Sequence, residues 1–134
     1  MNALSKWSPY AHAALRIISG LLFMEHGLMK LIQFPATQPG AADPLPPLML
    51  AAGLIEVVGG GLITLGLLTR WAAFVCSGMM AVAYFMAHAS QGPWPALNGG
   101  DAAILFCFAF LYLACAGAGP LSVDDALARK RGPV

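Results

Sequence analysis

The residues best suited to chemistry are two acids and two histidines inside otherwise apolar stretches. Glu25 and His26 interrupt LLFMEHGLMK, Glu56 interrupts GLIEVVGG, and His88 ends another apolar run. A carboxyl group in apolar surroundings binds a proton, finds a cation or meets water. With the imidazoles, such groups suit proton transfer or hydrogen bonding to a polar head group. We therefore take Glu56, His26 and His88 as candidate catalytic residues.

A purely structural role competes with chemistry for each of these side chains. The two acids can serve as hydrogen-bonding links between helices, whose measured contributions in membranes are modest. A metal site needs three or four converging ligands, and we predict no metal site from the acids and histidines. The three cysteines form no CxxC pair, so they indicate neither a zinc site nor a disulfide framework.

The composition places these residues in a membrane protein. Of the 134 residues, 59% are hydrophobic and only 10% are charged, whereas soluble domains carry about 25% charged residues. The formal net charge is +1, which points to no nucleic-acid partner. A chain of this length usually forms one domain. We predict a single membrane domain over residues 1–134, in contact with the lipid bilayer.

Four apolar runs are long enough to cross a hydrocarbon layer, which takes about 20 residues. Prolines, glycines and polar clusters separate the runs. We predict an all-α fold, a four-transmembrane-helix bundle with helices at about 11–34, 47–68, 71–90 and 101–117 and a polar tail at 118–134. The first run imitates a signal peptide, but charges follow it without a clear cleavage site, so we expect it to be retained.

The basic residues predict the orientation of this bundle. Four helices place both termini on one side together with the turn at Arg70, and that side holds six of the seven Lys and Arg residues. Because Lys and Arg are enriched in cytoplasmic loops, we predict that both termini are cytoplasmic. Arg16 and Lys30, near the two ends of the first helix, are expected to reach the head groups.

Helical periodicity predicts which faces the candidates occupy. Small residues surround Glu56 on its helix, which indicates that Glu56 points into the bundle. Tyr84 and His88 belong to a narrow stripe that is expected to face inward too. Their placement predicts a polar cavity in the half of the bundle away from the termini.

Other residues are candidates for binding a ligand in that cavity. Asp101, Phe108 and Tyr112 share one face of the last helix, which would set an acid at the cavity mouth above two rings. Glu25 lies level with Glu56, but its face is left open. The candidate ligand-binding residues are Glu25, Tyr84, Asp101, Phe108 and Tyr112.

Three blocks of the sequence match a known pattern. They are RIISGLLFMEHGLMKL, AGLIEVVGGGLITLGLLTRWAA and NGGDAAILFCFAFLYLACAGAGPLSVDDAL. Together they resemble the DoxX family of small bacterial and archaeal membrane proteins, from about Leu15 to Leu127. The family usually has glutamate after NGG, where this chain has Asp101, and Glu25 has no firm counterpart. The resemblance implies a four-helix protein of the bacterial inner (plasma) membrane.

The resemblance also implies a redox role. Family members are associated with a terminal quinol oxidase, with thiosulfate:quinone oxidoreduction and with membrane complexes against oxidative or thiol stress. The sequence has no haem, dinucleotide or P-loop pattern, so we expect no intrinsic cofactor. We predict a membrane subunit of a quinone-linked oxidoreductase or redox complex, with quinone as the ligand and membrane or membrane-associated redox proteins as partners.

Two other function classes stay open. A non-catalytic membrane scaffold or assembly factor would depend on helix packing and not on Glu56. A small-solute or proton transporter is disfavoured by the short chain and by the lack of an inverted repeat. The sequence does not decide whether the chain is an enzyme by itself or whether it forms a homo-oligomer.

Overall fold

The computed structural model describes residues 2–131, which contain helices and no strand. The elements are α1 (Asn2–Ser5), α2 (Ser8–Ile32), α3 (Pro47–Leu65), α4 (Thr69–Ala83), the π-helix η1 (Tyr84–His88), the 3-10 turn η2 (Ala89–Gln91), α5 (Pro95–Asn98), α6 (Asp101–Ala116) and α7 (Val123–Arg131). The prediction of an all-helical fold is confirmed. The long helices begin and end within three residues of the predicted limits, except that α4 ends at Ala83 and the predicted helix to about residue 90 is completed by η1 and η2. The predicted tail contains α7, and its residues 132–134 lie outside the described part.

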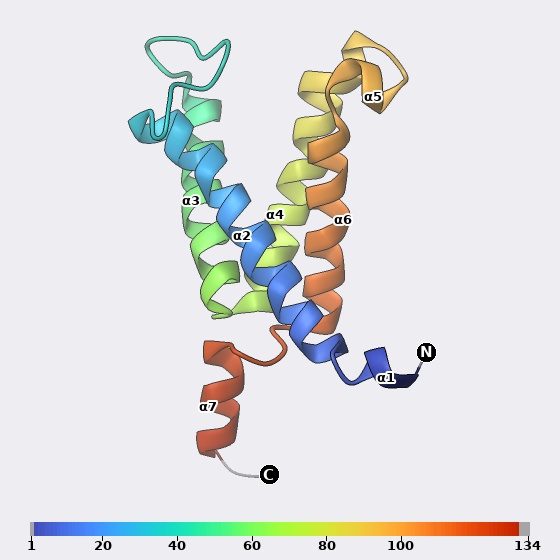
Figure 1. Ribbon diagram of the computed structural model, residues 1–134. Coiled ribbons are helices and arrows are strands. Elements are labelled where there is room, and N and C mark those ends of the chain that lie inside the picture. The colour runs from blue at the N-terminus through green and yellow to red at the C-terminus, as the bar shows by residue number, and fades with distance from the viewer. Residues whose placement is uncertain (1, 132–134) are drawn as a thin grey trace.

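The two ends of the bundle differ in which parts of the chain they contain (Figure 1). We call one the terminal end: it holds α1, the turn between α3 and α4, and α7. The other is the loop end, which holds segments 33–46 and 92–100. The chain runs up and down between them, so that α1 and α7 lie on one side of the bundle, together with Arg70 at the start of α4, as predicted.

Prolines and left-handed residues set the limits of the helices. Pro9 and Pro47 stand in the first turns of α2 and α3, where a missing N–H leaves no hydrogen bond unmade. α3 ends at Gly66, whose φ of 68° is favourable for glycine because it has no Cβ. α2 ends at Gln33, which also has a positive φ of 58°, and the prolines of segment 33–46 prevent the helix from continuing.

Two helix pairs make up the bundle, α2 with α3 and α4 with α6. Glycines bring α2 and α3 to backbone contact, since a Cβ added to Gly27 would lie 2.7 Å from the carbonyl oxygen of Gly53. One added to Gly60 would lie 2.7 Å from the carbonyl oxygen of Gly20. α2 crosses the bundle obliquely and diverges from α6 toward the loop end (Figure 1), so the two pairs are packed less closely there.

The core lies between the two helix pairs. Phe23, Ile63, Phe110 and Leu113 have at most 1% of their surface exposed. The rings of Phe23 and Phe110 meet edge to face, with centroids 4.8 Å apart, a favourable aromatic geometry. This apolar layer separates the polar groups of the terminal end from those of the loop end.

The outer surface of the bundle is suited to lipid. Large apolar side chains are exposed on every long helix, for example Ile18, Val58, Phe74 and Leu105, each more than half exposed. Apolar exposure of this extent marks a membrane or protein contact surface. α3 and the helix running from Thr69 to Gln91 are long and apolar enough to cross a membrane, and α6 is apolar but shorter.

Candidate functional site

A cavity of about 300 Å³ lies between the helix pairs in the loop-end half of the bundle. Polar side chains reach it from four elements: His26 and Lys30 from α2, Glu56 from α3, His88 from η1 and Gln38 from the loop between α2 and α3. The remaining wall is mainly apolar and includes Phe23, Met49, Met79, Met80 and Phe106. A mostly apolar wall with a few polar groups is typical of ligand sites.

Glu56 and Lys30 form an ion pair at this cavity. Lys30 Nζ donates to both carboxylate oxygens of Glu56 at 2.7 and 2.6 Å, and the two side chains are only 8% and 5% exposed. The prediction that Glu56 points into the bundle is confirmed. The expectation that Lys30 reaches the head groups is wrong, because Lys30 supplies the cation that a buried carboxylate needs.

The two cavity histidines each have one ring nitrogen held by a backbone carbonyl. His26 Nδ1 lies 2.8 Å from the carbonyl oxygen of Leu22, and His88 Nδ1 lies 3.0 Å from that of Asn98. A carbonyl oxygen only accepts, so Nδ1 carries the proton and Nε2 of the neutral ring is an acceptor. Within residues 2–131 neither Nε2 has a hydrogen-bond partner. The structure thus brings His26, His88 and Glu56 to one cavity.

The π-helix η1 positions His88. A π turn holds one more residue than an α turn and therefore shifts the faces of the residues that follow; such turns are frequent at functional sites. Tyr84 stacks beside the His88 ring at a centroid distance of 6.3 Å, and the carbonyl of Asn98 fixes its Nδ1. Tyr84 therefore packs against the His88 ring and does not itself line the cavity. The sequence pattern predicted a regular helix here and did not predict the π turn.

The aromatic residues predicted for α6 lie elsewhere. Phe108 and Tyr112 are 65% and 48% exposed, and the prediction that their rings pack the cavity is wrong. Phe106 lines the cavity in their place. Asp101 is the exposed first residue of α6 at the loop end and is not part of the cavity wall. α6 is apolar on every side, so its period alone could not show which face is buried.

Glu25 does not share the cavity with Glu56. It is exposed on α2 and absent from the cavity wall, and no hydrogen bond or ion pair joins it to another side chain within residues 2–131. The face of Glu25, which the sequence left open, is therefore the outer face of α2. The two carboxyl groups do not meet within one copy of the chain.

An apolar groove of about 690 Å³ runs between α2 and α6 beside the cavity. His26, Ala102 and Phe106 line both spaces. Its other walls include the exposed apolar side chains of Leu22 and Leu105. The polar cavity thus adjoins an apolar surface on the outside of the bundle.

The terminal end holds a buried arginine, Arg16, which the sequence predicted to reach the head groups. Arg16 is 0% exposed and does not reach the head groups. Its guanidinium donates at 2.6 to 2.9 Å to four backbone carbonyls, those of Ile63, Thr64, Ala118 and Leu121. These carbonyls lie at the end of α3 and in the segment between α6 and α7, where helix ends leave carbonyls without intrahelical partners; that of Ile63 also accepts from the Gly66 amide.

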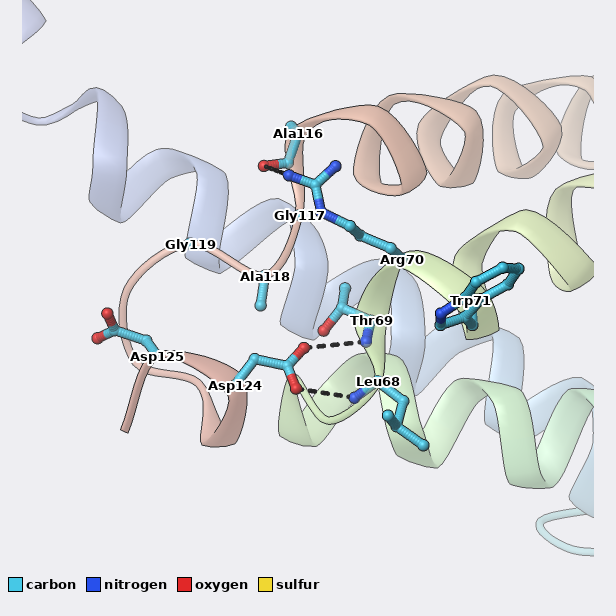
Figure 2. A pocket seen from close by; sticks show the side chains of 10 residues that line it. All are labelled: Leu68, Thr69, Arg70, Trp71, Ala116, Gly117, Ala118, Gly119, Asp124 and Asp125. Carbon is cyan, nitrogen blue, oxygen red and sulfur yellow. Dashed lines mark hydrogen bonds between the residues drawn. The ribbon is translucent and has the colours of Figure 1, made fainter. Parts of the chain in front are cut away.

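Two further charged residues join helix ends at the terminal end (Figure 2). The Asp124 carboxylate accepts from the backbone amides of Leu68 and Thr69 at 2.9 and 3.0 Å, at the start of α4, where amides lack intrahelical partners. Arg70 donates to three carbonyls at the end of α6, those of Ala114, Cys115 and Ala116. A second cavity, of about 430 Å³, lies between these groups.

The contacts of Asp124 also affect its ionisation. Burial by itself raises the pKa of this carboxyl, but the hydrogen bonds from Thr69 and Leu68 and the charge of Arg16 outweigh burial. The pKa of Asp124 is therefore lower than its usual value, which favours the carboxylate that accepts these bonds. At the terminal end, charged side chains and backbone groups thus form hydrogen bonds with each other.

Tyr112 takes part in this terminal end and not in the cavity. His12 Nε2 lies 3.0 Å from the carbonyl oxygen of Gly117 and must donate to it, so Nδ1 accepts from the Tyr112 hydroxyl at 3.0 Å. The imidazole thereby links α2 to the end of α6.

The fold and the cavity define a small helical membrane protein with a partly polar cavity in the loop-end half of its bundle. The chain belongs to the DoxX family, whose profile matches residues 11–89. It is also similar to a Haemophilus influenzae protein described as uncharacterized, with 42% identity over 97% of this chain and 100% of that relative. No solved structure matches the chain. The family prediction is confirmed, and the relative's description adds no function.

Proposed function

We propose that this protein is a membrane subunit of a quinone-linked oxidoreductase or redox complex and that its loop-end cavity binds the head group of a hydroquinone. The observation that carries the proposal is the pair of histidine acceptors beside a buried Lys30–Glu56 ion pair, in a cavity that adjoins an apolar groove. Electrons would pass to or from a partner protein.

The hydrogen-bonding character of the cavity favours the reduced form of a quinone. A hydroquinone has two hydroxyl donors on opposite sides of its ring, and neutral His26 and His88 each offer an Nε2 acceptor. A quinone has only carbonyl acceptors, which neutral imidazoles with this tautomer do not satisfy. Lys30 retains one N–H beyond the two donated to Glu56, and this N–H can donate to a ligand oxygen.

The size and surroundings of the cavity fit such a ligand. A volume of about 300 Å³ is at the lower end of the range for small-molecule sites and suits a single substituted ring. Phe23 and Phe106 supply aromatic walls. An apolar tail attached to the ring would lie in the groove between α2 and α6, where Leu22 and Leu105 are exposed.

Glu56 and Asp101 keep proton-handling roles in this proposal. Glu56 is paired with Lys30 and would exchange a proton with the ligand through the lysine or through water. Asp101 is exposed at the loop end, at the start of α6, and would connect the cavity to outside water. Both roles concern proton movement, which general acid and base groups provide.

The membrane arrangement that we propose places four helices across the bacterial inner membrane with both termini cytoplasmic. Both chain ends lie at the terminal end, where Lys6, Arg70, Arg129 and Lys130 are exposed. Lys and Arg are retained preferentially on the cytoplasmic side. The loop end, with the cavity, would then face the periplasmic half of the bilayer.

Binding measurements in lipid nanodiscs test the proposed site. We expect the purified protein to bind a short-tail hydroquinone more tightly than the corresponding quinone, and His88→Ala or His26→Ala to weaken hydroquinone binding about 10-fold, the effect of one lost hydrogen bond. His12→Ala is the matched control, because this imidazole lies at the terminal end, and it should bind normally. Lack of binding by the unmodified protein, or normal binding by both cavity variants, would overturn the proposal.

The competing function is a non-catalytic scaffold that holds partners in the membrane. The backbone contact between α2 and α3 at Gly20 and Gly60 is an observation that favours it, since it makes this pair a rigid unit. A scaffold predicts that cellular function is lost in Gly60→Leu and kept in Glu56→Gln. The quinone-linked function predicts that both variants lose it.

A further inference from the structure

The outer side of α2 carries an exposed stripe that the cavity does not use. At alternating spacings of three and four residues, the stripe contains Ala11, Ala14, Ile18, Leu21, Glu25, Leu28 and Ile32. All of these residues are exposed except Leu28, which is half-buried. This spacing sets side chains in one line along a helix, and Glu25 is the one polar member of the line.

In the membrane arrangement proposed above, Glu25 would lie inside the hydrocarbon layer by its position in α2. It is seven residues from the end of α2 at Ile32, or about 10 Å at 1.5 Å per residue, and about 25 Å from the start at Ser8. A hydrocarbon layer of about 30 Å therefore contains it. Glu56, at a similar depth, has Lys30 as its partner, whereas lipid chains offer Glu25 neither a hydrogen bond nor a charge.

We infer that this stripe is the interface with a second copy of the chain, in which α2 packs against α2 and the two Glu25 carboxyl groups hydrogen-bond to each other. Copies inserted in the same direction have parallel α2 helices, and a twofold axis along the membrane normal brings identical residues together at one depth. A second copy therefore supplies a polar group where Glu25 needs one.

The chemistry of a carboxyl group makes this contact self-complementary. A protonated carboxyl is a donor and an acceptor, and a carboxylate is an acceptor, so one shared proton joins the two groups and leaves at most one negative charge. An unrelated partner would have to present a donor at the same depth, a condition that the second copy meets by symmetry.

The rest of the stripe suits close packing of two parallel helices. An average spacing of 3.5 residues is that of left-handed helix pairs, and one polar residue in an apolar seam is known to fix register and partner number. Ala11 and Ala14 are small enough for close approach. The opposite flank of α2 is packed on α3 through Gly20 and Gly27. Ala14 and Ile18 of the stripe also border the groove between α2 and α6, so a second copy would cover part of the groove's α2 wall.

Fluorescence energy transfer between labelled copies in liposomes, measured as the ratio of protein to lipid is varied, tests the interface. The unmodified protein should form dimers. Glu25→Ala should weaken association about 10-fold, and Glu25→Gln should retain most of it, because an amide both donates and accepts. A protein that stays monomeric at every ratio, or a dimer that Glu25→Ala leaves unchanged, would overturn the inference. A circular dichroism spectrum and an unfolding midpoint of Glu25→Ala equal to those of the unmodified protein would show that the variant is folded.

Cysteine cross-linking identifies the face that is in contact. In a Cys115→Ser background, which removes the exposed native thiol, Leu21→Cys should form a disulfide-linked dimer on oxidation. Val58→Cys is the matched control, because Val58 is 59% exposed on the outer side of α3, and it should stay monomeric. Cross-linking at Val58 and not at Leu21 would show that another face, or another partner, covers this protein.

Discussion

The terminal end and the loop end use the same kinds of charged and polar side chains in opposite ways. At the terminal end, Arg16, Arg70 and Asp124 bind backbone groups that the helices leave unpaired. At the loop end, Lys30 and Glu56 bind each other, and two histidines keep one ring nitrogen without a partner in the described chain. A charged residue in a membrane bundle is thus no indication of chemistry until its partner is known.

The type of partner explains the difference between the two ends. Carbonyls and amides at helix ends are fixed by the fold, and a ligand could replace their contacts only by unfolding the ends of α3, α4 and α6. A side-chain ion pair beside a cavity can exchange partners while the helices stay in place. Stability should therefore depend most on the terminal end, and ligand binding on the loop end.

The largest expected effect is that of Arg16→Met. The substitution removes the side-chain donor of four buried or part-buried carbonyls, of which that of Ile63 keeps the Gly66 amide. We expect the free energy of unfolding to fall by about 3 kcal/mol, because each unsatisfied buried group is costly. Unfolding in mixed micelles with increasing dodecyl sulfate, followed by circular dichroism, measures it. Arg16→Lys should lose less, since an ammonium keeps three donors. An unfolding midpoint unchanged in Arg16→Met would show that the guanidinium does not hold this end.

A smaller effect is expected at the ion pair of the loop end. Lys30→Met leaves Glu56 buried without a cation, and we expect a loss of about 2 kcal/mol, limited because the carboxyl group can bind a proton. Adding Glu56→Gln should restore part of the loss, since it removes the uncompensated charge. The same unfolding assay on both single variants and the double variant gives the coupling free energy. Additive losses would mean that the pair contributes nothing to stability.

The smallest effect is expected for Asp124→Asn, about 1 kcal/mol at neutral pH, the usual value of a side chain that caps helix amides. Because the pKa of Asp124 is lowered in the folded protein, its contribution is present above the pKa of the unfolded chain and is lost as pH falls through the folded pKa. Unfolding measured from pH 7 down through the acid range should progressively narrow the difference between the unmodified protein and the variant.

Asp125 is the matched control for this last comparison. It pairs with Arg129 along the outside of α7, where the arginine is 75% exposed, and exposed pairs of this kind contribute little. Asp125→Asn should therefore unfold like the unmodified protein at every pH. A loss in Asp125→Asn as large as that in Asp124→Asn would indicate a general charge effect of α7 and not a helix cap.

Several features followed from the sequence alone. The breaks at Pro35 and Pro47 limit α2 and α3 in the structure as they do in the sequence pattern, because proline acts locally. α3 ends three residues before its predicted limit of 68, at the left-handed Gly66. The inward direction of Glu56 was also predictable, since its face of α3 carries the glycines that permit close packing. The family followed from several short blocks between about Leu15 and Leu127, and the family profile matches residues 11–89.

Only the tertiary structure decided which polar side chains meet. Lys30 and Arg16 were both predicted to reach the head groups. In the structure, Lys30 is the partner of Glu56, and Arg16 is buried and binds four carbonyls. The sequence pattern did not predict that Phe106 lines the cavity in place of Phe108. It did not predict that Glu25 is exposed either. In a membrane the lipid is as apolar as the core, so hydrophobic periodicity marks a helix without showing which of its faces is inside.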